Sequence, residues 1–181
     1  RRVLFRSTIR EASSIINNIK FDTVLDYGCA KGFMVYALRL LGKEAYGADV
    51  SEYAVNNCHP KVKGYLSVIE NAEQLSGGWD LIIAKDVLEH IPKDIIPSVL
   101  SELRRRCKIL FVAVPLGDGK RYRIREYEMD VTHVVREPEE WWLTTIVEAG
   151  FKIKHFDYEF GHMKENWTGN HPHGNAFIVA E

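Results

Sequence analysis

The stretch Val24-Leu25-Asp26-Tyr27-Gly28-Cys29-Ala30-Lys31-Gly32 decides the fold. Residues 23–27 form a short run suited to a buried strand, and residues 31–41 have apolar side chains at helical spacing. The two glycines between them allow a tight turn and a close approach of the backbone to a ligand. We therefore predict a strand, a glycine-rich loop and a helix whose first N–H groups lie near a ligand.

The spacing of this loop indicates the kind of ligand. A dinucleotide-binding loop reads G-x-G-x-x-G, which lets a pyrophosphate rest on the helix N-terminus. Here the order is D-x-G-x-x-x-G, and Asp26 would repel a pyrophosphate but attract an ammonium group. Asp49 ends the next predicted strand, about twenty residues beyond the loop, where an acid can accept both hydroxyls of a ribose. The pattern favours a nucleoside that carries an amino acid.

The rest of the chain alternates between short β-branched runs and longer helical ones. This alternation predicts one layered α/β domain with a mainly parallel sheet. The expected strands are 23–27, 45–50, 65–69, 80–84, 108–114, 151–158 and 175–180, and the expected helices are 8–19, 31–41, 52–57 (capped by Ser51), 92–106 and 137–150. The polar, arginine-rich stretch 117–136 is expected to be an inserted loop or lid.

Composition excludes several classes of protein. No apolar run reaches the roughly 20 residues needed to cross a bilayer, so no membrane partner is expected. Cys29, Cys58 and Cys107 form no C-x-x-C pair, so we expect neither a disulfide framework nor structural zinc, and a cytoplasmic location. The 24 basic and 25 acidic side chains give a net charge of −1, which predicts no surface for nucleic acid.

The first seven residues, Arg1-Arg2-Val3-Leu4-Phe5-Arg6-Ser7, resemble the in-frame translation of a common sequencing adapter. We therefore expect residues 1–7 to be a non-native scar and residues 8–181 to be one domain with a truncated N-terminus. A native basic N-terminus is the other interpretation. Without the three arginines, 21 basic side chains stand against 25 acidic ones, and the net charge becomes −4.

Four segments together point to a family. Residues 26–32, 47–51, 71–75 and 79–92 resemble the successive motifs of class I S-adenosylmethionine-dependent methyltransferases of the small-molecule type. The resemblance runs from about Phe21 to the C-terminus. It implies a Rossmann-like fold: a seven-stranded, mostly parallel sheet with helices on both faces and an antiparallel last strand. It also implies S-adenosylmethionine as the cofactor.

The resemblance assigns roles in cofactor binding. Gly28, Ala30 and Gly32 would line the methionine part, Asp26 would hold its amino group and Lys85 would lie beside it. Asp49 would bind the ribose hydroxyls. Val50 would pack on the adenine, and Asn71 and Ala72 would contact its edge. The expected cofactor-binding residues are Asp26, Gly28, Cys29, Ala30, Gly32, Phe33, Asp49, Val50, Asn71, Ala72 and Lys85. Ala30 replaces the usual middle glycine, and Asn71 stands where an aspartate is frequent.

The acceptor side has a weaker signal. Asp130-Val131-Thr132-His133 resembles an Asp-x-Thr-His segment of many small-molecule members. We expect His133 to take a proton from the acceptor, Asp130 to orient its ring and His90 to face the methyl group. The alternative is that these residues only tie the loop to the sheet. No metal is expected, because the other histidines lack companions at ligand spacing.

The predicted function is methyl transfer from S-adenosylmethionine to an oxygen or nitrogen of a small-molecule acceptor. Two alternatives remain open. One is a non-catalytic subunit of the same fold that binds the cofactor or a partner. The other is a nicotinamide-dependent reductase, which the spacing of the loop disfavours.

Overall fold

One seven-stranded sheet organises the part of the chain that the structure, a computed structural model, describes: residues 2–181, with side chains for residues 6–181. The strands are β1 (Thr23–Tyr27), β2 (Glu44–Asp49), β3 (Leu66–Val68), β4 (Trp79–Lys85), β5 (Cys107–Pro115), β6 (Ile153–Asp157) and β7 (Asn175–Ala180). The α-helices are α1 (Arg2–Asn18), α2 (Phe33–Leu40), α3 (Glu52–Asn56), α4 (Ile96–Arg106), α5 (Glu139–Glu148) and α6 (Glu165–Thr168). Short 3-10 turns are η1 (Pro60–Tyr65), η2 (Ala72–Gln74), η3 (Leu88–His90) and η4 (Arg125–Met129).

The strand order places the two halves of the sheet on either side of β1. The order is β3-β2-β1-β4-β5-β7-β6; β1 to β5 run parallel, and β7 is antiparallel to both of its neighbours. The chain reverses direction across the sheet between β1 and β4, and ligands of such sheets bind at the carboxyl ends of the strands at this point. The predicted Rossmann-like fold with its antiparallel last strand is confirmed.

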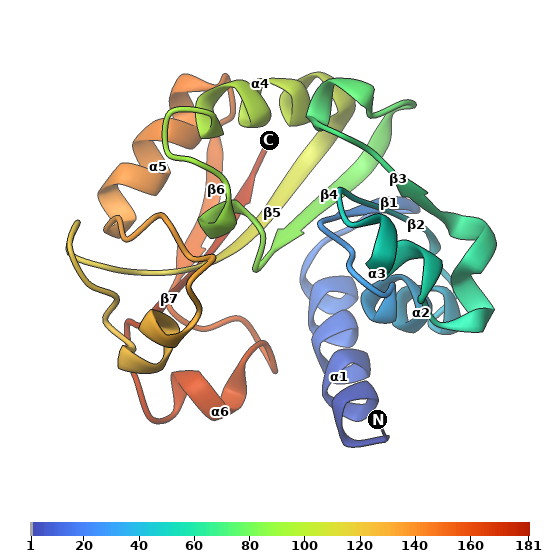
Figure 1. Ribbon diagram of the computed structural model, residues 1–181, viewed down its shortest axis with the longest axis horizontal. Helices are drawn as coiled ribbons and strands as arrows, with labels where there is room; N and C mark the ends of the chain where they lie inside the picture. Colours follow the sequence, from blue (N-terminus) through green and yellow to red (C-terminus); the bar gives the residue numbers. More distant parts are fainter. Residues whose placement is uncertain (1) are drawn as a thin grey trace.

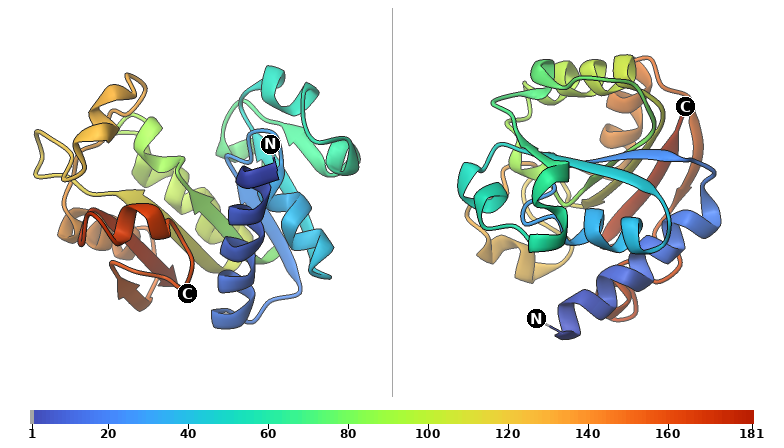
Figure 2. Two further views of the ribbon diagram at one scale, coloured as in Figure 1. Left: turned by 90° about the horizontal axis from the view of Figure 1, so that it is seen from below. Right: turned by 90° about the vertical axis from the view of Figure 1, so that its right-hand side faces the viewer.

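Helices cover both faces of the sheet (Figure 1). On one face, α4 and α5 bury a cluster that includes Leu100, Leu103 and Trp142, whereas α1 and α2 bury Ile15 and Leu38 on the other face. The right-hand view in Figure 2 shows α4 and α1 on opposite sides of the strands. No helix among the described residues is long and apolar enough to cross a membrane.

Four helices begin at other residues than expected: α2 and α5 begin two residues later, at Phe33 and Glu139, and α1 and α4 differ by more. α1 begins at Arg2 rather than Thr8, because no proline or glycine interrupts residues 2–18. The expected scar, residues 1–7, lies partly outside the described residues and stays a prediction. α4 begins at Ile96 rather than Pro92, because residues 92–95 form a separate turn and Pro97 takes a first-turn position that suits proline.

The segment 117–136 projects from the carboxyl end of β5 and is closed at its base. The N–H of Gly117 donates to the carbonyl of Glu137 (3.1 Å), and the N–H of Gly119 donates to that of Arg136 (2.7 Å). The Tyr122 hydroxyl donates to the carbonyl of Val135 from a buried position (2.7 Å). These bonds fix the segment over the carboxyl ends of the strands.

The closure depends on the absence of a side chain at Gly117. A Cβ there would lie 2.2 Å from the carbonyl oxygen of Arg136. We expect Gly117→Ala to lower the free energy of unfolding by about 1–3 kcal/mol and to speed tryptic cleavage within 117–136. Urea unfolding and timed proteolysis measure both effects. Gly64→Ala is the control, because a Cβ at Gly64 meets nothing within 4 Å. Equal stability of the two variants would contradict the prediction.

Candidate functional site

The loop after β1 has the backbone of a ligand-binding turn. Gly28 and Gly32 have φ of 79° and 71°, and Ala30 also has positive φ, 46°. The N–H groups of Gly28 and Cys29 donate to the carbonyl of Ala48 (2.8 and 3.2 Å), which fastens the loop to the end of β2. A Cβ at Gly28 would lie 2.4 Å from Cγ2 of Val87. The loop therefore requires glycine at this position for both conformation and space.

Asp49 holds the loop from the next strand. Its Oδ2 accepts a hydrogen bond from the N–H of Ala30 (2.7 Å), and its Oδ1 accepts one from the N–H of Ser51 (2.8 Å). Ser51 caps α3 as predicted, since its hydroxyl accepts from the N–H of Ala54 (3.1 Å). A carboxylate has about four acceptor sites, so Asp49 still has capacity for ligand hydroxyls.

Asp26 is a buried acid without a partner. The residue is 6% exposed, and among the described residues no hydrogen bond to its carboxylate is found, although its oxygens are not sealed from solvent as Oε2 of Glu89 is. Burial raises the pKa of Asp26 to about 7; the charge of Lys85 opposes the rise and that of Asp49 adds to it. A buried carboxyl of this kind gains a strong stabilising contact when an ammonium group binds beside it.

A pocket of about 400 Å³ opens beside the loop. Two of its apolar side chains face solvent, Val50 at 65% and Ile95 at 45% exposure. Such exposed aliphatic side chains at a pocket wall suit the flat face of a base. The expected residues that line the pocket are Gly28, Ala30, Asp49, Val50, Asn71, Ala72 and His90.

The sequence did not predict the remaining residues that line this pocket. The additional lining residues are Tyr27, Ala48, Ile69, Glu70, Asp86, Val87, Ile91, Ile95 and Val99. The four-residue spacing of Val87, Ile91 and Ile95 is a signal that could have identified this apolar wall. Ile69 and Val99 carry no such signal, because they look like ordinary core residues.

Five of the expected cofactor residues do not line this pocket: Asp26, Cys29, Gly32, Phe33 and Lys85. Cys29 is buried beneath the loop, and burial raises the pKa of its thiol well above the usual range. Its backbone N–H helps to fasten the loop to β2. Gly32 begins α2 and Phe33 packs near the His59 ring. Asn71 lines the pocket, but its Oδ1 already accepts from the N–H of Glu73 (3.0 Å).

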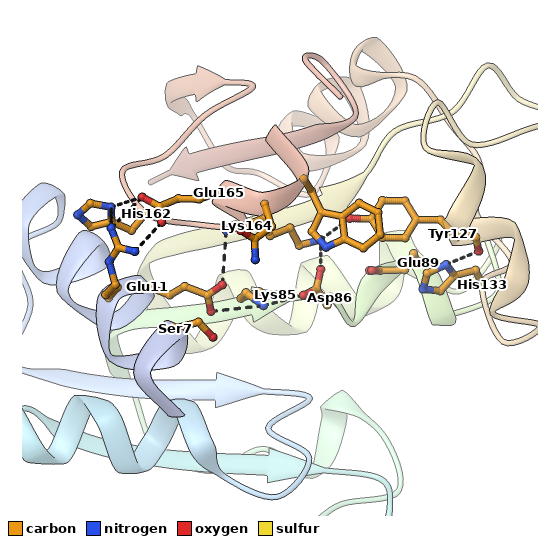
Figure 3. A pocket seen from close by; sticks show the side chains of 13 residues that line it. Ser7, Glu11, Lys85, Asp86, Glu89, Tyr127, His133, His162, Lys164 and Glu165 are labelled. Atoms are coloured by element: carbon orange, nitrogen blue, oxygen red, sulfur yellow. Dashed lines mark hydrogen bonds and ion pairs between the residues drawn. The ribbon is translucent and has the colours of Figure 1, made fainter. Parts of the chain in front are cut away.

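A second pocket, of about 340 Å³, lies beyond the end of β4 (Figure 3). Here Lys85 contacts Asp86 (2.6 Å) and Glu11 of α1 (3.7 Å). Lys164, from the segment before α6, pairs with the same Asp86. Burial would raise the pKa of Asp86, but the charges of Lys164 and Lys85 hold it well below its usual value. Asp86 lines both pockets, so the two adjoin at this residue.

The histidines expected to be catalytic lie together beside this junction. The rings of His90 and His133 are 4.6 Å apart between centroids. Nδ1 of His133 is hydrogen bonded to the carbonyl of Tyr127 (3.0 Å), whereas Asp130 Oδ2 is 3.8 Å from its Nε2. The Tyr127 carbonyl therefore sets the orientation of the ring. Burial, with the neighbouring His90, lowers the pKa of His133 below its ordinary value.

The pKa of Asp26 gives a stability prediction. The folded state binds this proton more tightly than the unfolded chain, so wild-type stability falls as pH rises from about 4 to about 7. Asp26→Asn carries no charge, and we expect it to exceed the wild type by about 1–3 kcal/mol in free energy of unfolding at pH 8. Urea unfolding at pH 8 and at pH 5 should show this advantage shrinking at the lower pH.

The matched control is Asp22→Asn, since the Asp22 side chain is 99% exposed. This variant should not show the gain in stability at pH 8 that we expect of Asp26→Asn. A ligand-free Asp26→Asn protein that is less stable than the wild type at pH 8 would argue against an unpaired buried carboxylate.

The environment of His133 predicts a defined tautomer. With its pKa below the ordinary value of 6.5 and Nδ1 facing a carbonyl, the ring at pH 6.5 should be mostly neutral with its proton on Nδ1. Nitrogen-15 NMR of the metal-free protein measures this directly, with the exposed His155 as an internal comparison. A doubly protonated His133 at that pH would disprove the assignment.

The chain resembles methyltransferases in sequence and in structure. A family model described as a methyltransferase domain matches residues 1–165. The magnesium-protoporphyrin O-methyltransferase of Synechocystis sp. (strain ATCC 27184 / PCC 6803 / Kazusa) is 30% identical over 105 residues, 52% of this chain and 46% of that protein. The matched part thus spans about half the length of this curated relative.

Two solved structures share the fold. A SAM-dependent methyltransferase from Archaeoglobus fulgidus is 17% identical with a TM-score of 0.73, over 99% of this chain and 98% of that one. The magnesium protoporphyrin IX methyltransferase of Synechocystis PCC 6803, with bound SAH, is 18% identical with a TM-score of 0.70, over 97% and 82%. The predicted cofactor, S-adenosylmethionine, agrees with the SAM dependence of the first protein and the SAH bound to the second. By its match over residues 1–165, the chain belongs to the methyltransferase domain family.

Proposed function

We propose that the chain is an S-adenosylmethionine-dependent methyltransferase that acts on an oxygen or nitrogen of a small-molecule acceptor. The observation that carries the proposal is the pair of acids at the carboxyl ends of adjacent strands. Asp26 is buried and unpaired, and Asp49 lies at the edge of a largely apolar pocket. Asp49 and Val50, which line the pocket, would face a ribose and a flat base, while Asp26, which lies near the end of β1 and does not line the pocket, would have to reach the ammonium group past Gly28.

The cofactor site follows from these features. Asp26 would hold the ammonium group, and the backbone of Gly28 and Ala30 would approach the methionine part. Asp49 would accept hydrogen bonds from the ribose hydroxyls, and Val50 would pack on the adenine. The donor set fits the group, because Asp49 keeps acceptor capacity for two hydroxyls and the exposed side chain of Val50 offers an apolar face to a base.

The second pocket is the site that we assign to the acceptor. It adjoins the first at Asp86, and α1, the end of β4 and the segments around Tyr127 and Lys164 line it (Figure 3). Its charged side chains are largely paired with one another, as with Lys164 on Asp86. A modest volume of about 340 Å³ supports a small molecule rather than a polymer.

Bound S-adenosylmethionine supplies a methyl group that is already activated by its positive sulfur. The acceptor atom forms a bond to the methyl carbon while the carbon–sulfur bond breaks and its electron pair stays on sulfur. The protein mainly has to position the partners and exclude water. The acceptor's proton goes to a base, and the neutral Nε2 of His133, which lines the acceptor pocket, is suited to receive it.

A small-molecule acceptor agrees with the name of the sequence relative, magnesium-protoporphyrin O-methyltransferase. The two alternatives have less support. A nicotinamide cofactor needs a G-x-G-x-x-G loop for its pyrophosphate, which the loop from Asp26 to Gly32 does not have. A non-catalytic role leaves the paired pockets and the neutral histidine between them without a use.

Calorimetric titration tests the proposal. We expect S-adenosylhomocysteine to bind and NADH not to bind. Asp49→Ala should weaken S-adenosylhomocysteine binding by about 1–3 kcal/mol, because hydrogen bonds to the ribose are lost. Asp49→Asn, which keeps one acceptor oxygen, should lose less. Glu52→Ala, an exposed change in the adjoining α3, should bind like the wild type.

Binding of NADH but not of S-adenosylhomocysteine would overturn the proposal in favour of a reductase. Wild-type affinity in Asp49→Ala would refute the ribose assignment. Binding of S-adenosylhomocysteine with no transfer of labelled methyl groups to any hydroxyl or amine acceptor would favour the non-catalytic alternative.

A further inference from the structure

Three side chains of the types that commonly bind metal ions lie close together where the two pockets meet. One ring nitrogen each of His90 and His133 and one carboxylate oxygen of Glu89 all lie within 4.8 Å of one another. His90 lines the cofactor pocket, while Glu89 and His133 line the acceptor pocket. From this convergence we infer that Glu89, His90 and His133 bind a divalent transition-metal ion at the junction.

The nitrogen lone pairs of both rings are directed by hydrogen bonds. Nδ1 of His133 faces the carbonyl of Tyr127, which can only accept, so this nitrogen carries the proton. Nδ1 of His90 is 2.8 Å from the hydroxyl of Thr132, and that hydroxyl donates to Asp130 (2.6 Å). It can therefore accept from His90. Each ring is left with an unprotonated Nε2, and metal-binding histidines are commonly held by this kind of contact.

Glu89 supplies the negative charge. Its side chain is 1% exposed, and its Oε2 has no hydrogen-bond partner among the described residues. An unpartnered buried carboxylate oxygen is destabilising unless a cation or a proton compensates it. One oxygen of this carboxylate lies within 4.8 Å of a ring nitrogen of each histidine, so a cation shared by the three groups would compensate it.

The backbone holds the three ligands in place. Glu89 and His90 are adjacent in η3, and the N–H groups of Val134 and Val135 donate to the carbonyl of Glu89 (2.9 and 3.3 Å). These bonds dock the strip that carries His133 directly onto η3. Figure 3 shows Glu89 and His133 side by side at one end of the acceptor pocket. The ligands are thus preorganised by main-chain contacts.

The donor set indicates the class of metal. Two imidazoles and one carboxylate suit first-row transition ions such as Zn²⁺, Co²⁺, Mn²⁺ and Fe²⁺, whereas Mg²⁺ and Ca²⁺ prefer oxygen ligands throughout. Three protein ligands leave coordination positions open. These positions adjoin the acceptor pocket, so a hydroxyl of the acceptor can fill one of them.

This use of the ion rests on the proposed function. A metal-bound hydroxyl gives up its proton to water at lower pH than a free one, because the ion stabilises the oxygen's electron pair. That oxygen then bonds to the methyl carbon as the carbon–sulfur bond breaks and its electron pair stays on sulfur. The metal-bound lone pair of His133 would no longer serve as the base. The site therefore favours oxygen over nitrogen acceptors.

Titration with Co²⁺ tests the site. Untagged protein is freed of metal with a chelator and titrated with Co²⁺, with visible absorption and calorimetry as readouts. We expect one Co²⁺ per chain in the wild type. Glu89→Gln and His133→Ala should weaken its binding tenfold or more. His155→Ala, which removes an exposed histidine of β6, should leave it unchanged.

Thr132→Val provides a second test that touches no ligand. It removes the contact to Nδ1 of His90 and should weaken Co²⁺ binding about tenfold. Titration with S-adenosylhomocysteine shows whether each variant is folded and separates the two proposals. Wild-type protein that binds S-adenosylhomocysteine but not Co²⁺ overturns the metal site alone. Wild-type Co²⁺ affinity in Glu89→Gln or Thr132→Val overturns it as well.

Discussion

The parallel pairing of β1 with β2 on one side and β4 on the other is the constraint on which the rest of the structure depends. Asp26 pairs in register with Gly47 and with Ile83, so the ends of the three strands lie at one edge of the sheet. Asp26, Asp49 and Lys85 all lie at this edge. The charge of Asp49 raises the pKa of Asp26, and the charge of Lys85 lowers it. Without parallel strands the same residues would lie at opposite ends.

This arrangement has an energetic consequence. A carboxylate at the end of a central strand is buried by the helices on both faces, and Asp26 has no partner to compensate it. Burial therefore makes an ionised Asp26 unfavourable for stability, and the proposed ammonium group of the ligand would relieve this cost. Asp49 differs, because backbone N–H groups hold both of its oxygens. Asp26 therefore has no contact that a ligand would have to replace, whereas Asp49 also holds the loop in place.

The sequence predicted the local features well and the distant ones poorly. The strand, loop and helix around Asp26 are encoded in consecutive residues, and Ser51 caps α3 because its cap contact spans three residues. Lys85 was expected beside the methionine part, yet it lies among the residues of the second pocket through its contacts with Asp86 and Glu11. No local pattern reveals that Lys164 pairs with Asp86, since 78 residues separate them.

The grouping of Glu89 and His90 with His133 also required the fold, because backbone bonds from residues 134 and 135 bring the segments together.

We expect Asp26 to be protonated in the free protein and to become ionised when it receives the ammonium group of the ligand. Calorimetry of S-adenosylhomocysteine binding at pH 6, in two buffers of different ionisation enthalpy, measures the protons exchanged. With a pKa of about 7 in the free protein, Asp26 should release nearly one proton on binding. The release should disappear in Asp26→Asn. Binding without proton release in the wild type, or with equal release in the variant, would show that Asp26 is not the group that ionises on binding.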